Sequence, residues 1–227
     1  MGADGKPSWL FFLAFGFLPQ LLMSMDGGST SAAADSIKDE KSLDFTHFQL
    51  SLLGCLVPAG MTVSSVLWGR ALQLLPAKHL VTTGLGANAI CTYAFGTVRM
   101  KNLMFVAKLL MGVCQGLHMV WGTSWVMANA PRERTATWLG LGPVSAGIGT
   151  GMGLVLSGYT TSWGFSYGLS WQVVGVGLAC LCCCLCAAPA ESLSFNRCGS
   201  GGACGDVEKV PAPSTWPAAG ADVGAGP

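Results

Sequence analysis

One apolar stretch, Asn102 to Ala128, is long enough to cross a lipid bilayer and carries a single charged residue, Lys108. A helix of about 20 apolar residues spans the hydrocarbon core of a membrane, which is about 30 Å thick. A cation at the centre of such a span costs about 2.5–3.5 kcal/mol on insertion scales. The stretch therefore predicts a transmembrane helix. Lys108 in turn predicts an acidic partner, a watery cavity or a route for its ammonium to the head groups.

The composition agrees with a membrane protein. Hydrophobic residues make up 51% of the 227 residues and charged residues only 10%, whereas a typical soluble domain has about 25% charged residues. The net charge of +1 provides no electrostatic footprint for nucleic acid. We therefore expect an integral membrane protein with lipid around it and no nucleic-acid partner.

Charged and turn-forming residues divide the chain into six expected spans. No charged residue stands between Thr135 and Ala190, a stretch too long for one helix, so a hairpin is expected at Thr160–Gly164. The expected fold class is all-α: a six-span transmembrane helical bundle over residues 1–188 and a disordered Gly/Pro/Ala-rich tail over 189–227. The spans are expected over 8–34, 48–72, 80–98, 102–128, 135–159 and 167–188.

Arginine and lysine residues in the short loops set the expected orientation, because cytoplasmic loops carry the excess of positive charge. With the N-terminus inside, the inner side has seven basic residues, which are Lys6, Arg70, Lys78, Arg132, Arg134, Arg197 and Lys209. The outer side has four, which are Lys38, Lys41, Arg99 and Lys101. We therefore expect a multi-pass protein with both termini in the cytosol. The sequence does not identify the membrane.

Asp26 is the expected partner of Lys108. At about 1.5 Å per residue, Asp26 lies about 27 Å along the first span from Ser8, and Lys108 lies about 9 Å below the outer end of the fourth span. These depths agree, so an ion pair between the two spans is expected as part of a substrate or coupling site. In the alternative, Asp26 lies in a frayed helix end and the Lys108 side chain extends to the outer head groups.

Gln115 and His118 are two further candidates on the fourth span. Gln115 is expected to face the same cavity as Lys108 and to contact the substrate. His118 is either a proton relay or, as is more common for a neutral histidine in a bundle, a satisfied hydrogen-bonding group. Both residues are therefore candidates for a substrate or coupling role.

Glycines spaced by four residues are expected to pack helices together, since small residues let helix backbones approach closely in a membrane. They occur in the fourth and fifth spans, as Gly112 and Gly116, Gly147 and Gly151, and Gly149 and Gly153. Most aromatic residues beside the turns are expected to be interface anchors; these are Trp121, Trp125 and Trp138 at the inner turn and Trp163 and Tyr167 at the outer turn. In the alternative, Trp121 and Trp125 stack on an apolar substrate.

No sign of an enzyme site is found. A hydrolase elbow, a phosphate loop and paired carboxylates are all lacking from the sequence, so we expect no catalytic residue and no cofactor. Cys183, Cys184 and Cys186 include a C-x-x-C spacing, but zinc requires four ligands, and no histidine or second cysteine pair stands nearby outside the lipid. S-palmitoylation at the cytosolic end of the last span is the favoured alternative.

The chain resembles the amino-terminal six-helix half of a major facilitator superfamily transporter over roughly Ser8 to Ala188. Charged turns follow the second and fourth spans, as in that superfamily. The segments 48–53, 142–149 and 170–171 look most like its spinster group. The residues that match the superfamily's fourth-helix pattern and the following Pro-x-Glu-Arg turn are Lys108 (in place of Arg), Gly112, Gly116, Pro131, Arg132, Glu133, Arg134 and Gly140.

The resemblance implies a transporter that moves a small organic or lipid-like solute by alternating access, with the first and fourth helices lining a central cavity. It also implies an inner-gate network in which Glu133 bridges to Arg70. In the alternative, these charged residues are topology signals that contact lipid head groups. The inner-gate candidates are Arg70, Arg132, Glu133 and Arg134.

Three departures from the family pattern define a second hypothesis. The loop after the second span keeps Arg70 but lacks the family's aspartate and second glycine, and Gln115 stands where spinster-like proteins have an acid. The family has twelve helices, so a path between two halves is expected to be only half encoded, and a homodimer or a second transporter half would complete it. The alternative function is a truncated, non-transporting membrane protein that associates with a full-length transporter or with itself.

Overall fold

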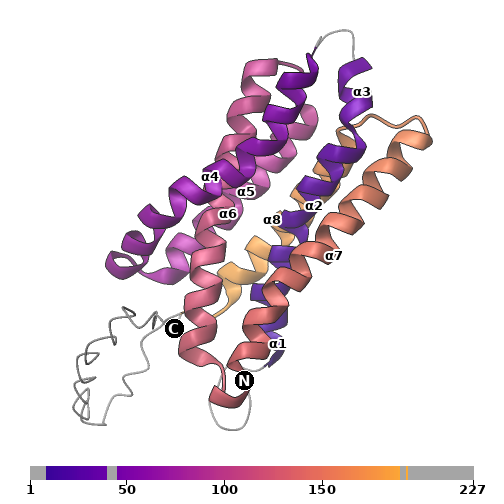
Figure 1. Ribbon diagram of the computed structural model, residues 1–227. Helices are drawn as coiled ribbons and strands as arrows, with labels where there is room; N and C mark the ends of the chain where they lie inside the picture. Colours follow the sequence, from indigo (N-terminus) through magenta and orange to yellow (C-terminus); the bar gives the residue numbers. More distant parts are fainter. Residues whose placement is uncertain (1–8, 40–44, 190–192, 194–227) are drawn as a thin grey trace, which may run out of the picture. The chain divides into compact units, whose positions relative to one another are not determined.

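Six long helical segments make up most of the computed structural model, which describes residues 9–39, 45–189 and 193 (Figure 1). No strand occurs in these residues, so the all-α prediction is confirmed. The first segment is continuous from Trp9 to Ala32 but contains a π-helical turn, η1. The elements are α1 (Trp9–Phe12), η1 (Leu13–Phe17), α2 (Leu18–Ala32), α3 (Ala34–Asp39), α4 (His47–Leu74), α5 (Ala77–Thr97), α6 (Lys101–Asn129), η2 (Arg132–Arg134), α7 (Thr135–Ser162) and α8 (Leu169–Ala187).

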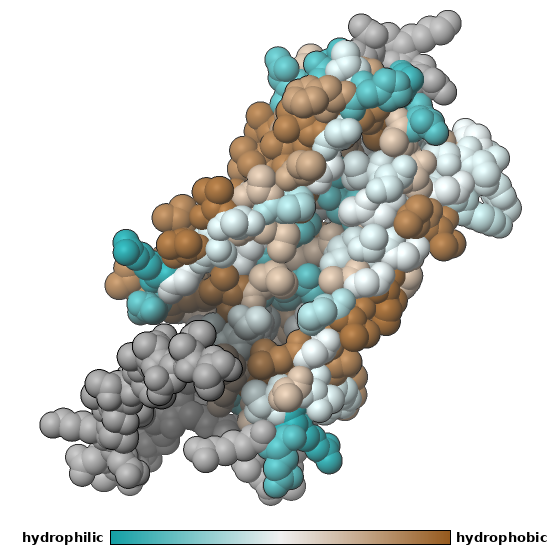
Figure 2. Space-filling model, viewed as in Figure 1, coloured by the Kyte–Doolittle hydropathy of each residue, from teal (hydrophilic) through white to brown (hydrophobic). Residues whose placement is uncertain are grey.

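Five of the six expected spans are supported by length and composition. The segments Trp9–Ala32, α4, α6, α7 and α8 are long and apolar enough to cross a membrane. Helix α5 stands at the third expected span but is less apolar, because threonines and glycines interrupt it. Figure 2 shows apolar side chains along the lengths of the helices and hydrophilic ones gathered near their ends. The expected tail over 189–227 lies outside the described residues, except Pro189 and Leu193.

Most of the helix pairs that pack together are not consecutive in the sequence. Helix α2 packs on α7, α4 on α6, and α5 on both α6 and α8. Gly112 and Gly116 allow the close approach of α6 to α4: a Cβ atom on Gly112 would lie 2.3 Å from the Val57 carbonyl oxygen, and one on Gly116 would lie 2.4 Å from Ser64 Oγ. These two glycines lie at a helix contact, as the spacing predicted.

Gly147 and Gly151 make no corresponding contact within this bundle. Among the described residues, no atom lies within 4 Å of a Cβ placed on either glycine. Helix α7 instead contacts α2 through Gly149 and Gly153, where a Cβ would lie 2.2 Å from the Leu21 carbonyl oxygen and 2.0 Å from that of Met25. Residues two apart on a helix are about 200° apart around its axis, so one pair faces α2 and the other faces away.

A Gly149→Leu variant is expected to lose about 1–3 kcal/mol of unfolding free energy, the usual cost of overpacking a close contact. The matched Gly147→Leu variant should unfold like the wild type, because its side chain enters open space. Thermal unfolding in detergent measures both. Equal destabilisation by the two substitutions would contradict the assignment of the contact face.

Aromatic residues near the start of α1 form a buried cluster. The ring of Trp138 stacks on that of Phe12 at 5.0 Å and on that of Trp125 at 6.3 Å, and each of these side chains is at most 6% exposed. Trp121 is also buried. The prediction that these tryptophans anchor the protein at the membrane interface is therefore wrong, because they pack between helices instead.

Candidate functional site

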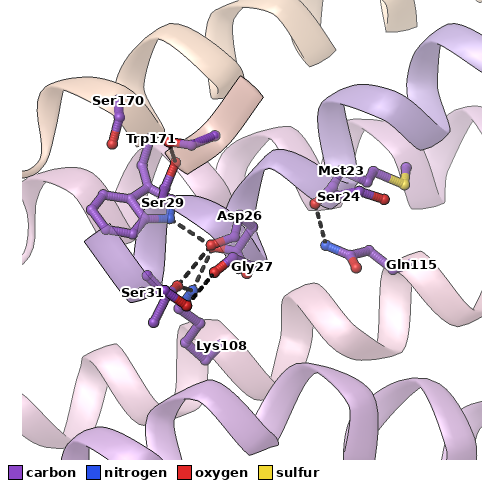
Figure 3. A network of polar contacts seen from close by, with 12 residues as sticks. Met23, Ser24, Asp26, Gly27, Ser29, Ser31, Lys108, Gln115, Ser170 and Trp171 are labelled. Atoms are coloured by element: carbon purple, nitrogen blue, oxygen red, sulfur yellow. Dashed lines mark hydrogen bonds and ion pairs between the residues drawn. The ribbon is translucent and has the colours of Figure 1, made fainter. Parts of the chain in front are cut away.

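A buried ion pair joins α2 to α6. The Lys108 ammonium binds Asp26 Oδ1 (Figure 3). The Asp26 side chain is 4% exposed and that of Lys108 is 1% exposed. The ion pair that the estimated membrane depths of Asp26 and Lys108 predicted is therefore present in the structure. The alternative, in which Lys108 extends to the outer head groups, is wrong because its ammonium lies inside the bundle.

Two neighbours hold the ion pair in place. The indole Nε1 of Trp171, on α8, donates a hydrogen bond of 2.6 Å to Asp26 Oδ1. Lys108 Nζ donates to Thr30 Oγ1 at 2.7 Å, and the Thr30 hydroxyl donates to the Asp26 carbonyl oxygen at 2.8 Å. Three helices thus meet at one carboxylate. Sequence reasoning missed both Trp171 and Thr30.

Aromatic rings surround the Lys108 ammonium. It lies 4.4 Å from the ring centre of Phe95, on α5, and 5.4 Å from that of Trp171. The two rings meet edge to face at 4.9 Å. Cation–π attraction strengthens when the cation is desolvated, so these rings partly replace the water that Lys108 has lost.

Asp26 also faces a cavity that contains several polar side chains. A cavity of about 220 Å³ between α2, α4 and α6 is lined by Asp26, Thr30, Ser31 and Gln115, among others. A second cavity, of about 320 Å³, shares Thr30, Ser31 and Gly54 with the first. The two cavities therefore adjoin. Polar and charged residues of the second cavity, around the start of α4, are Asp35, Lys38, His47 and Ser51.

Gln115 lines the same cavity as Asp26, whereas His118 lies elsewhere. Gln115 Nε2 donates to the Met23 carbonyl oxygen at 3.4 Å and lines the Asp26 cavity. His118 is ten residues from Lys108 along α6, which is about 15 Å. Its Nε2 lies 3.4 Å from the carbonyl oxygen of Gly16, in the π-helical turn. His118 lines a separate cavity of about 60 Å³.

The expected inner-gate bridge is not present. Arg70 lies four residues before the end of α4, Glu133 lies in η2, and both are exposed. Among the described side chains, no ion pair joins Glu133 to Arg70. Arg134 is exposed as well, and the side chain of Arg132 lies outside the described part of the chain. Glu133 and Arg134 in the turn after α6 are therefore exposed, and the described side chains form no Glu133–Arg70 bridge.

No group of three His, Cys, Asp or Glu side chains in the described ranges is placed to hold a metal ion. Comparison with known proteins gives one positive result. A family profile described as Major Facilitator Superfamily matches residues 9–193, which include all six long helical segments. No curated protein matches the chain.

Proposed function

Because the chain belongs to the major facilitator superfamily, we propose that it moves a small organic or lipid-like solute across a membrane by alternating access. Members of this superfamily are multi-pass membrane proteins and secondary transporters, not enzymes. The proposed coupling element is the pair Asp26–Lys108, which is closed in one state and open in another. The spinster group remains the proposed relative within the superfamily, on the segments 48–53, 142–149 and 170–171.

The observation that carries this proposal is the position of the ion pair beside a cavity that contains polar side chains. Burying two charges costs several kcal/mol per ion, and apolar residues of similar size often stabilise a fold at least as well. A pair kept only for packing would have no need of an adjoining cavity. Here Asp26 faces the ion pair on one side and the cavity with Ser31 and Gln115 on the other. Water, a proton or a polar solute group can therefore reach the carboxylate.

The adjoining cavities define the proposed route. We place both termini in the cytosol and count α5 as the third of six spans, so that the cavity lined by Lys38 and His47 opens to the outer side. A solute enters between α2 and α4, passes Thr30 and Ser31, and reaches the ion pair. Uptake of a proton by Asp26, or of an anionic solute group by Lys108, removes the attraction between α2 and α6. The two helices are then free to rearrange.

Labelling of introduced cysteines tests alternating access without a known solute. Ser31→Cys lines the outer cavities, and Thr123→Cys lines the cavity near His118. In a background with the native cysteines replaced, Asp26→Asn is expected to change their reaction with a membrane-impermeant maleimide in opposite directions, because opening one side closes the other.

The matched control is Glu133→Gln, which removes an exposed carboxylate that lines none of these cavities and leaves the ion pair intact. It should leave the labelling of both introduced cysteines as in the parent protein. If Asp26→Asn also left both labelling rates unchanged, the pair would be a fixed packing contact and the proposed switch would be wrong.

A further inference from the structure

A second, apolar groove runs between α5 and α8. It has a volume of about 620 Å³ and shares no residue with the Asp26 cavities. Short side chains on the two facing helices create it, including those of Gly86, Ala89, Gly175 and Ala179. Along α5 the groove extends from Gly86 to Thr97, which is about 16 Å at the rise of an α-helix.

Two cysteines line one end of this groove, and they differ in availability. Cys182 is half-buried, and its Sγ donates to the Thr82 carbonyl oxygen at 3.4 Å. Cys183 is an exposed, free thiol. Three more exposed thiols on α8 are not part of the groove lining, and these are Cys180, Cys184 and Cys186. Cys183 is thus an accessible thiol at the end of the apolar groove.

Cys183 lies close to the end of α8 that the proposed orientation places in the cytosol. It precedes the last helical residue, Ala187, by four positions, which is about 6 Å. At that end, Lys78 Nζ donates to the carbonyl oxygens of Cys186 at 3.0 Å and Ala188 at 2.6 Å. Lys78 lies in the first turn of α5, and a lysine near the end of a membrane helix extends its ammonium to the water-facing edge, so we take it as the marker of the interface. The groove leads from Cys183 away from this edge.

We propose that Cys183 is an S-acylation site and that its fatty acyl chain lies in the groove between α5 and α8. The sulfur of Cys183 attacks the carbonyl carbon of a long-chain acyl-CoA. A thioester S–C bond forms, the bond to the CoA sulfur breaks, and the Cys183 proton leaves with free CoA thiol. No oxidant or reductant is needed. The covalent chain is favoured over a free lipid tail because the thiol stands at the interfacial end, which is where a tethered chain must begin.

Metabolic labelling tests the site. The full chain, with the tail cysteines Cys198 and Cys204 changed to serine, is expressed in eukaryotic cells supplied with an alkyne-tagged palmitate. The expected result is hydroxylamine-sensitive label that Cys183→Ser removes. The matched control changes the thiols outside the groove and keeps the label; its substitutions are Cys180→Ser, Cys184→Ser and Cys186→Ser. An unlabelled parent protein, or label that survives Cys183→Ser, overturns the proposal.

A second variant tests whether the acyl chain lies in the groove. Ala179→Phe fills the groove without changing the thiol. The acyl chain is then excluded from the groove, so the thioester should be more exposed and be cleaved faster by hydroxylamine in detergent. Val173→Phe adds the same ring to an exposed position outside the groove lining and should leave the rate unchanged. Equal cleavage rates in the two variants would show that the acyl chain lies elsewhere and that the groove holds ordinary membrane lipid.

Discussion

A Lys108→Met variant is expected to lose about 3–5 kcal/mol of unfolding free energy, because removing one partner leaves the other charge buried and unpaired. The Asp26 carboxylate is 4% exposed and would keep the Trp171 hydrogen bond but lose its counter-charge. Unfolding in mixed detergent micelles, followed by circular dichroism, measures this loss.

The informative control is the double variant Asp26→Asn with Lys108→Met. Both charges are then gone, so most of the lost stability should return, while any transport that depends on the pair should not. If the single and double variants were equally unstable, the loss would come from packing around Lys108, and the ion pair would contribute little.

Trp171→Phe is expected to cost about 1.5–3 kcal/mol of unfolding free energy, the usual value of a hydrogen bond to a charged group. The substitution keeps an aromatic ring beside Phe95 but removes the Nε1 that donates to Asp26 at 2.6 Å. Trp163→Phe is the matched control, since that ring is 66% exposed. The same unfolding experiment compares them. Equal stability of the two variants would show that the indole hydrogen bond does not hold Asp26.

The charged pair was predictable because membrane depth is a one-dimensional quantity. Counting residues along two antiparallel spans placed Asp26 and Lys108 at the same level, and the cost of an unpaired charge in lipid supplied the reason for contact. The same count could not find Trp171, because nothing in a tryptophan's position along α8 indicates that its ring faces α2. Which side of a helix faces which neighbour is set by three-dimensional packing.

The glycines show the same limit. A spacing of four predicted that α7 has a close-packed face, but both Gly147–Gly151 and Gly149–Gly153 have that spacing. Only the contact with α2 separates them. The prediction that the inner tryptophans anchor the protein at the interface was wrong for a related reason. Trp125 and Trp138 stand at the depth of an interface, but their rings turn inward against Phe12. Depth was predictable from the sequence, whereas direction around the helix axis was not.

Solute uptake by proteoliposomes tests the central claim most directly. Vesicles containing the wild type, Asp26→Asn or Glu133→Gln protein are incubated with a defined mixture of amino acids, organic acids, sugars, nucleosides and lysophospholipids, and their contents are measured by mass spectrometry. We expect at least one solute to accumulate above the level in empty vesicles with the wild type and Glu133→Gln proteins, but not with Asp26→Asn. Accumulation that is the same with and without the Asp26 carboxylate, or no accumulation of any solute, would contradict transport through this ion pair.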